Sequence, residues 1–144
     1  MRISLLLILL VVAGCRSGAS GDGSNGVVIG PGLAMVKDSA SLRQGIIGEV
    51  RMRPMRPIDY GADAVAAPFP DAPILVENAD NVPLGRISSD TNGMFYIAVD
   101  PGTHYLKPQK IPGKMFPHPL PGERIYVPEG GVVRVVLNYD TGIR

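Results

Sequence analysis

The sequence is poor in the residue types that build disulfides, metal sites and aromatic binding faces. It has one cysteine among 144 residues, so an intramolecular disulfide cannot form. It has no tryptophan and five tyrosines with three phenylalanines, which places carbohydrate binding behind protein binding. Its two histidines, His104 and His118, do not have the close spacing of a ligand pair. We therefore expect neither a metal site nor a cofactor.

The first residues indicate an export signal. The basic start Met1-Arg2 precedes Ile3 to Val12, which is apolar almost throughout. An apolar run of about ten residues is typical of the central region of a secretory signal and is too short to span a bilayer as a helix.

The lone cysteine follows this run in the tetrapeptide Val12-Ala13-Gly14-Cys15, which closely resembles the lipobox of bacterial lipoproteins. The resemblance implies that residues 1–14 are a lipoprotein signal peptide. It also implies that Cys15 carries the acyl chains, palmitate among them, that hold the protein on the membrane. Arg16 stands where an aspartate would favour retention in the inner membrane, so the resemblance points to the outer membrane. An ordinary secretory signal with a cysteine at its cleavage site is the alternative.

The balance of charge excludes a general attraction to polyanions. The full chain has 14 basic and 13 acidic side chains, and loss of residues 1–14 removes Arg2 and leaves 13 of each. A neutral chain gains little from counterion release, so nucleic-acid binding is not expected.

Composition divides the mature chain into two parts. Residues 15–43 begin with the lipidated cysteine and are rich in Gly, Ser, Asn and Asp up to residue 32, which predicts a flexible linker. Residues 44–144 carry the strand patterns and form the folded domain. In the stretch 33–42 no clear pattern assigns a structure.

Alternating apolar and polar residues predict about seven strands in the folded part. They cover 44–52, 72–77, 82–88, 94–99, 103–107, 123–127 and 131–140. Turn residues at Asp90-Thr91-Asn92-Gly93 and at Pro128-Glu129-Gly130-Gly131 favour hairpins. The fold class is therefore all-β, a single antiparallel β-sandwich.

Three segments together resemble the carboxypeptidase regulatory-like family of transthyretin-like, or prealbumin-like, sandwiches. They are Gly45-Ile46-Ile47-Gly48-Glu49-Val50, Ala72-Pro73-Ile74-Leu75-Val76 and the run from Ser89 to Thr103 that contains Asp90-Thr91-Asn92-Gly93 and Asp100-Pro101-Gly102. The resemblance covers residues 44–139 and implies an accessory module of envelope and secreted proteins without catalytic machinery of its own. A Pro/Arg-rich insertion after the first strand departs from the family pattern.

Two loops are candidate binding sites. The first carries Arg51, Arg53 and Arg56, which can bind phosphates, anionic glycans or carboxylates of a partner. The second is the Pro-rich stretch 107–121. The simpler interpretation of the arginines is a solvated charged loop.

The sequence thus predicts a non-catalytic envelope lipoprotein whose sandwich binds another envelope protein or a glycan. The alternative is a small hydrolase of transthyretin-like fold that uses His104 or His118. Since no motif brings these histidines together with an acid, solvent-facing or turn positions are the simpler expectation for both, and no catalytic residue is assigned. The sequence does not predict the oligomeric state.

Overall fold

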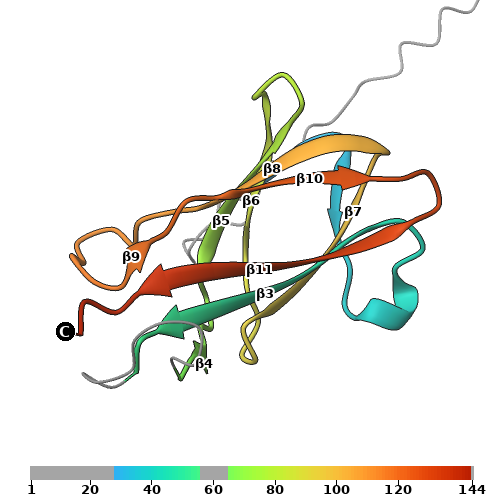
Figure 1. The fold of residues 1–144 in the computed structure, drawn as a ribbon. Coiled ribbons are helices and arrows are strands. Elements are labelled where there is room, and N and C mark those ends of the chain that lie inside the picture. Colours follow the sequence, from blue (N-terminus) through green and yellow to red (C-terminus); the bar gives the residue numbers. More distant parts are fainter. Residues whose placement is uncertain (1–27, 56–64, 144) are drawn as a thin grey trace, which may run out of the picture.

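The computed structural model describes residues 28–55 and 65–143, which form two β-sheets packed face to face (Figure 1). The predicted all-β class and sandwich architecture are confirmed. Seven strands have five or more residues, and each coincides with a predicted strand: β3 (Gly45–Arg53), β5 (Pro73–Asn78), β6 (Pro83–Ser88), β7 (Met94–Val99), β8 (Gly102–Pro108), β10 (Glu123–Val127) and β11 (Val132–Asp140). The described residues contain no helix that is long and apolar enough to cross a membrane.

Short strands complete the two sheets. They are β1 (Val28–Ile29), β2 (Leu33–Met35), β4 (Ala67–Pro68) and β9 (His118–Pro119). One sheet has the order β1-β6-β5-β8-β10 and the other β2-β7-β3-β11-β9, with β4 paired to β3. The pairings are antiparallel except that of β3 with β11, which runs in parallel from Gly45 opposite Val132 to Arg53 opposite Asp140. A parallel pair needs a long connection, and nearly the whole domain lies between these two strands.

The two predicted hairpin turns do not join neighbouring strands of one sheet. Each connects a strand of one sheet to a strand of the other. Residues 90–93 join β6 to β7, and residues 128–131 join β10 to β11, in each case across the sandwich. The chemistry of the first turn is as predicted, because Asp90 Oδ1 accepts the backbone N–H groups of Asn92 and Met94, both at 2.8 Å. Gly93 has a φ of 74°. Turn residues show that the chain reverses, but they do not specify which sheet it enters.

The folded part begins earlier than predicted. Residues 28–43, assigned to the linker, contribute β1, which pairs with β6, and β2, which pairs with β7. A short 3₁₀ helix, η1 (Ser39–Ser41), follows, and Leu33 and Leu42 are buried. The boundary at residue 44 is therefore wrong, because strands of two or three residues are too short to show a period in the sequence.

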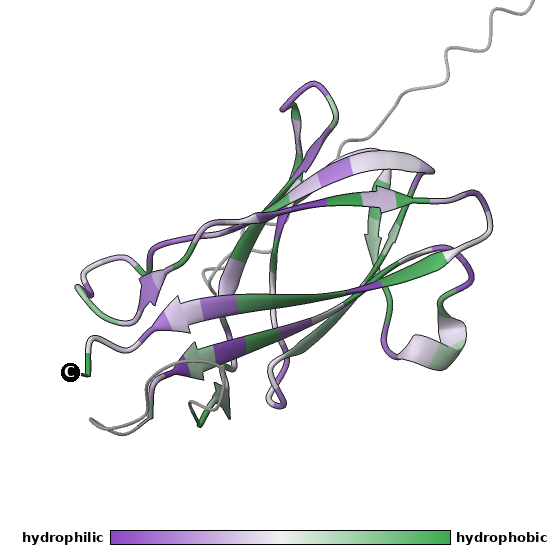
Figure 2. Ribbon diagram, in the orientation of Figure 1, coloured by the Kyte–Doolittle hydropathy of each residue, from purple (hydrophilic) through white to green (hydrophobic). Residues whose placement is uncertain are grey.

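The inward-facing side chains of both sheets form one apolar core. Apolar and polar residues alternate in the later part of β3, from Glu49 to Arg53, and of β11, from Leu137 to Asp140 (Figure 2). The largest buried side chains are Tyr139, Phe95, Ile46, Ile74, Ile87, Ile97, Leu106 and Leu137. Gly48 leaves space for the ring of Phe95, since a Cβ at Gly48 would lie 1.9 Å from Phe95 Cζ.

Gly48→Ala is expected to lower the free energy of unfolding by about 1–3 kcal/mol, because the added methyl group displaces the Phe95 ring. Phe95→Ala alone should cost about 3–5 kcal/mol. The double variant Gly48→Ala/Phe95→Ala should be more stable than the sum of the two losses predicts, since the ring is no longer there to be displaced. Urea denaturation of the four proteins measures this, and strictly additive losses would contradict it.

Candidate binding surface

Four segments meet at the end of the sandwich where β3 and β11 finish. In Figure 1 the end of β3, strand β9 and the carboxyl terminus lie together there. The backbone N–H of Thr141 donates to the Arg53 carbonyl at 3.2 Å, and the Thr141 hydroxyl donates to the Pro54 carbonyl. Leu120 N–H donates to Asn138 O at 3.1 Å, which attaches the long Pro-rich loop to β11. Hydrogen bonds therefore connect the segments at this end of the molecule, which are not separate loops.

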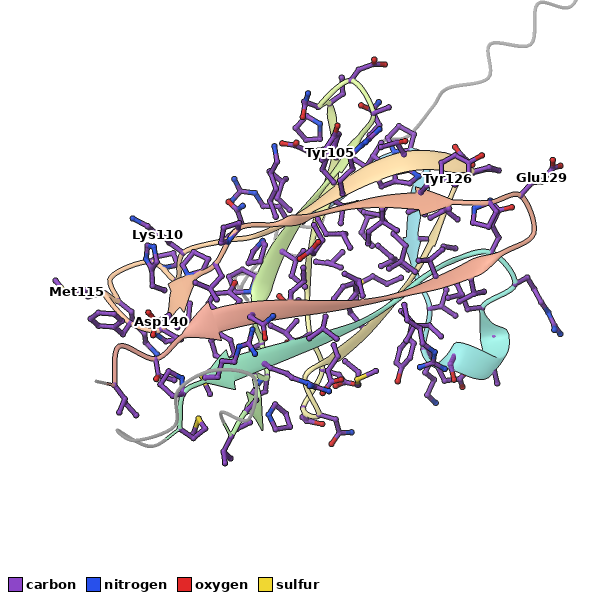
Figure 3. All side chains as sticks on the ribbon, in the orientation of Figure 1. Tyr105, Lys110, Met115, Tyr126, Glu129 and Asp140 are labelled. Atoms are coloured by element: carbon purple, nitrogen blue, oxygen red, sulfur yellow. The ribbon has the colours of Figure 1, made fainter. Side chains whose placement is uncertain are left out.

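Exposed apolar side chains gather at the same end. The described residues have ten exposed large hydrophobic side chains, and four of them lie here: Met55, Val65, Met115 and Phe116. We call these four the apolar end surface. Met115 is 83% exposed. In Figure 3 it lies at the end of the molecule opposite Glu129. An apolar group of this kind on a folded domain marks an interaction site more often than a single exposed side chain does.

Backbone hydrogen bonds and close packing connect the members of this surface. Met55 N–H donates to the Val65 carbonyl at 3.2 Å. Gly142 lies against the Phe116 ring, since a Cβ at this glycine would be 2.5 Å from Phe116 Cε1. Thr141, next to Gly142, is bonded to the segment that carries Met55. The four side chains thus belong to neighbouring segments of one surface.

Tyr139 holds the base of the long loop against the sandwich. Its hydroxyl accepts the Gln109 N–H at 3.1 Å and lies 2.9 Å from the Pro73 carbonyl and 2.8 Å from that of Gln109. The Phe69 ring packs edge-on against its ring, with centroids 4.8 Å apart. Burial raises the pKa of the Tyr139 hydroxyl to about 12. The loop therefore leaves β8 from a fixed point.

A groove of about 210 Å³ lies beside this base, between β5–β6 and the start of the loop. Ile111 and Pro112 line it together with the exposed cations Arg86 and Lys110. The structure gives these two cations no side-chain hydrogen bond or ion pair within residues 28–55 and 65–143. Lys114 is exposed one residue before Met115. The apolar end surface is therefore accompanied by positive charge.

The predicted arginine loop is not a loop where the structure describes it. Arg51 and Arg53 belong to the last residues of strand β3, and Arg56 lies outside the described residues. Arg51 donates from Nε and Nη2 to the two carboxylate oxygens of Glu49, at 2.6 and 2.7 Å. This pairing holds the pKa of Glu49 below its usual range and raises that of Arg51. Arg51 is therefore already satisfied by its neighbour on the same strand.

The two histidines have different environments. His118, on β9, is exposed as expected. His104 is only 4% exposed, so its predicted surface position is wrong. Its Nε2 lies 2.8 Å from the Asp100 carbonyl, and its Nδ1 has no partner among the described residues. Because a carbonyl only accepts, Nε2 is the protonated nitrogen of the ring. His104 lies on the inward-facing side of β8, where it packs against the core. The two-residue period of the strand is enough to indicate this position.

Cys15 lies outside the described residues. The described part of the chain contains no group of three or more His, Cys, Asp or Glu that could hold a metal ion. The sequence pointed to residues 107–121 as a loop but did not single out Met115 and Phe116. An adjacent pair of large apolar residues between Lys114 and Pro117, outside any strand, was the available signal.

No protein-family model matches the chain, and no curated protein matches it. The resemblance to the carboxypeptidase regulatory-like family therefore stays a prediction.

Proposed function

We propose that this protein is a lipid-anchored accessory protein of the bacterial envelope whose sandwich binds another envelope protein through the apolar end surface. The observation that carries the proposal is the exposure of Met55, Val65, Met115 and Phe116 together at one cross-connected end of the domain. The lipobox around Cys15 supports the anchor and the envelope location. The resemblance to accessory sandwiches supports a role in binding.

The composition of this surface favours a protein as its partner. Methionine and phenylalanine are enriched in the centres of protein interfaces, where their burial removes water from apolar area. Full burial of a Met or Phe side chain contributes roughly 1.5–3 kcal/mol. Lys110 and Lys114, both exposed beside the apolar residues, suit a partner with an acidic rim.

Photo-cross-linking in intact cells tests this proposal. A photoreactive amino acid in place of Met115 is expected to give a discrete adduct with one envelope protein, identified by mass spectrometry. The matched control is the same amino acid in place of Val132, which is 41% exposed at the other end of β11. The adduct from position 115 should disappear when Phe116→Asp is added. Equal adducts from positions 115 and 132, or no adduct from position 115, would refute the proposal.

A further inference from the structure

We propose a second binding site, for an acidic polysaccharide, on the outer face of the β8–β10 pair. This site is separate from the apolar end surface and does not depend on the proposed function. It is built from outward-facing tyrosines and cations on two neighbouring strands. The scarcity of aromatic residues in the sequence had placed carbohydrate binding behind protein binding, and the structure shows where two of the few tyrosines lie.

Tyr105 and Tyr126 lie on the same face of the sheet. The register pairs Arg124 with Tyr105 and Tyr126 with Thr103, and the side chains at these positions point away from the core, since the alternate positions His104, Leu106, Ile125 and Val127 are buried. Tyr105 and Tyr126 are thus diagonal neighbours, roughly 7–8 Å apart along such a pair. Figure 3 shows both on this part of the molecule.

Exposure distinguishes these rings from core tyrosines. Tyr126 is 68% exposed and Tyr105 is half-buried, whereas Tyr139 is completely buried. A tyrosine ring has an apolar face and a polar tip, which suits the two kinds of surface that a sugar ring presents, its C–H face and its hydroxyl groups. Two such rings on neighbouring strands form a short platform for successive sugar units of one chain.

Arg124 supplies the charge that suits an acidic glycan. Lys107 Nζ lies 5.9 Å from the Tyr105 ring centroid, but the Glu77 carboxylate, to which it donates, already balances its charge. Arg124 is exposed, and its side chain has no hydrogen bond or ion pair among the described residues. Its guanidinium can bind a sugar carboxylate through two hydrogen bonds.

The fold leaves this face accessible. Strand β10 is the last strand of its sheet and, among the described residues, pairs only with β8. A polysaccharide can therefore approach over the edge of β10 without displacing another strand. The apolar side chains that form the proposed protein surface lie at the far end of β11, so the two ligands do not compete for the same residues.

Affinity electrophoresis of the full mature chain in detergent tests the proposal, with polygalacturonate as the acidic probe and dextran as the neutral one. The protein should be retarded by polygalacturonate and not by dextran, and added NaCl should weaken the retardation. Arg124→Ala is expected to weaken binding about tenfold, since a charged hydrogen-bond donor is lost. The matched control Arg134→Ala, an exposed arginine on the outer face of the other sheet, should bind as the wild type does.

Variants of Tyr126 separate stacking from hydroxyl contacts. Tyr126→Ala should weaken binding of polygalacturonate about tenfold, whereas Tyr126→Phe, which keeps the ring, should retain most of it. Met115→Ser, which changes the apolar end surface, should bind the glycan as the wild type does. The glycan proposal and the protein-binding proposal can therefore fail independently of each other. No retardation by polygalacturonate, equal retardation by dextran, or an equal effect of Arg134→Ala would overturn the inference. A dimer in solution that Tyr126→Ala abolishes would overturn it too, since the face would then bind a second copy.

Discussion

Tyr139→Phe is expected to lower the free energy of unfolding by about 2–4 kcal/mol although it removes a single oxygen atom. The ring is completely buried, and its hydroxyl is the hydrogen-bond partner of Gln109 N–H and of the carbonyls of Pro73 and Gln109. Each buried group that loses its partner costs about 1–3 kcal/mol. Urea denaturation measures the loss. A change below about 0.5 kcal/mol would show that water replaces the hydroxyl.

The same residue predicts a pH dependence in the alkaline range. Tyrosine in an unfolded chain has a pKa of about 10, whereas burial raises that of Tyr139 to about 12. Between these values the unfolded state releases the proton first, so the stability that Tyr139 supplies is complete below pH 10 and declines as pH rises towards 12. The decline is at most about 1.4 kcal/mol per pH unit.

Tyr139→Phe should therefore show a shallower decline of unfolding free energy than the wild type between pH 10 and 12. The control is Tyr126→Phe, which removes a hydroxyl from an exposed ring and should leave the wild-type decline in place. Identical slopes for the wild type and Tyr139→Phe would contradict the assignment.

Loss of this hydroxyl also bears on binding. Tyr139 fixes Gln109 at the start of the loop that carries Met115 and Phe116. In the variant, this loop and the apolar end surface should therefore be held less firmly in position. We expect the cross-link from position 115 to weaken in Tyr139→Phe. Immunoblotting measures the amount of protein in each sample, so a weaker cross-link can be distinguished from lower abundance of the variant.

The strands could be predicted from the sequence because each has one buried face. Along β11, Leu137 and Tyr139 are buried and Arg134 and Val136 are exposed, which is the alternation that the sequence displays. The connections could not be predicted in this way. A turn such as residues 90–93 has the same Asp, Asn and Gly residues whether the chain returns beside its own strand or crosses to the other sheet.

The candidate site was predictable only as a region. Prolines between 108 and 121 show that no long strand runs through this stretch, so a long surface loop was foreseeable, although the two-residue strand β9 was not. Its attachment was not, because the three bonds of Tyr139 join residues far apart in sequence. The arginine loop was misplaced for a related reason. Arg51 continues the strand and pairs with Glu49, two residues earlier on the same face, which a charge count does not reveal.

Cys15→Ser is expected to abolish incorporation of a clickable fatty acid and to release the protein from the membrane fraction. Each buried methylene of an acyl chain contributes about 0.8 kcal/mol, and stable anchoring needs two or more chains, so loss of the acylated thiol removes the whole attachment. In-gel fluorescence after labelling, with fractionation of the same cells, measures both effects. Ser17→Ala, a conservative change two residues away, is the control and should be labelled like the wild type. Equal labelling of wild type and Cys15→Ser would refute lipidation at this position.

The proposed lipid anchor also limits how far the proposed binding surfaces can reach from the membrane. Residues 16–27, which the composition predicts to be part of a flexible linker, lie outside the described residues. A flexible chain of that length has an end-to-end distance of roughly 17–21 Å. In the proposed anchored protein, confinement within this distance of the membrane raises the local concentration of the proposed partner, so a weak contact at Met115 and Phe116 can suffice. The cross-link from position 115 should therefore be lost in Cys15→Ser although its surface is unchanged. It should return in that variant when another membrane anchor replaces the lipid. Failure of the new anchor to restore it would show that the tether does not act through proximity.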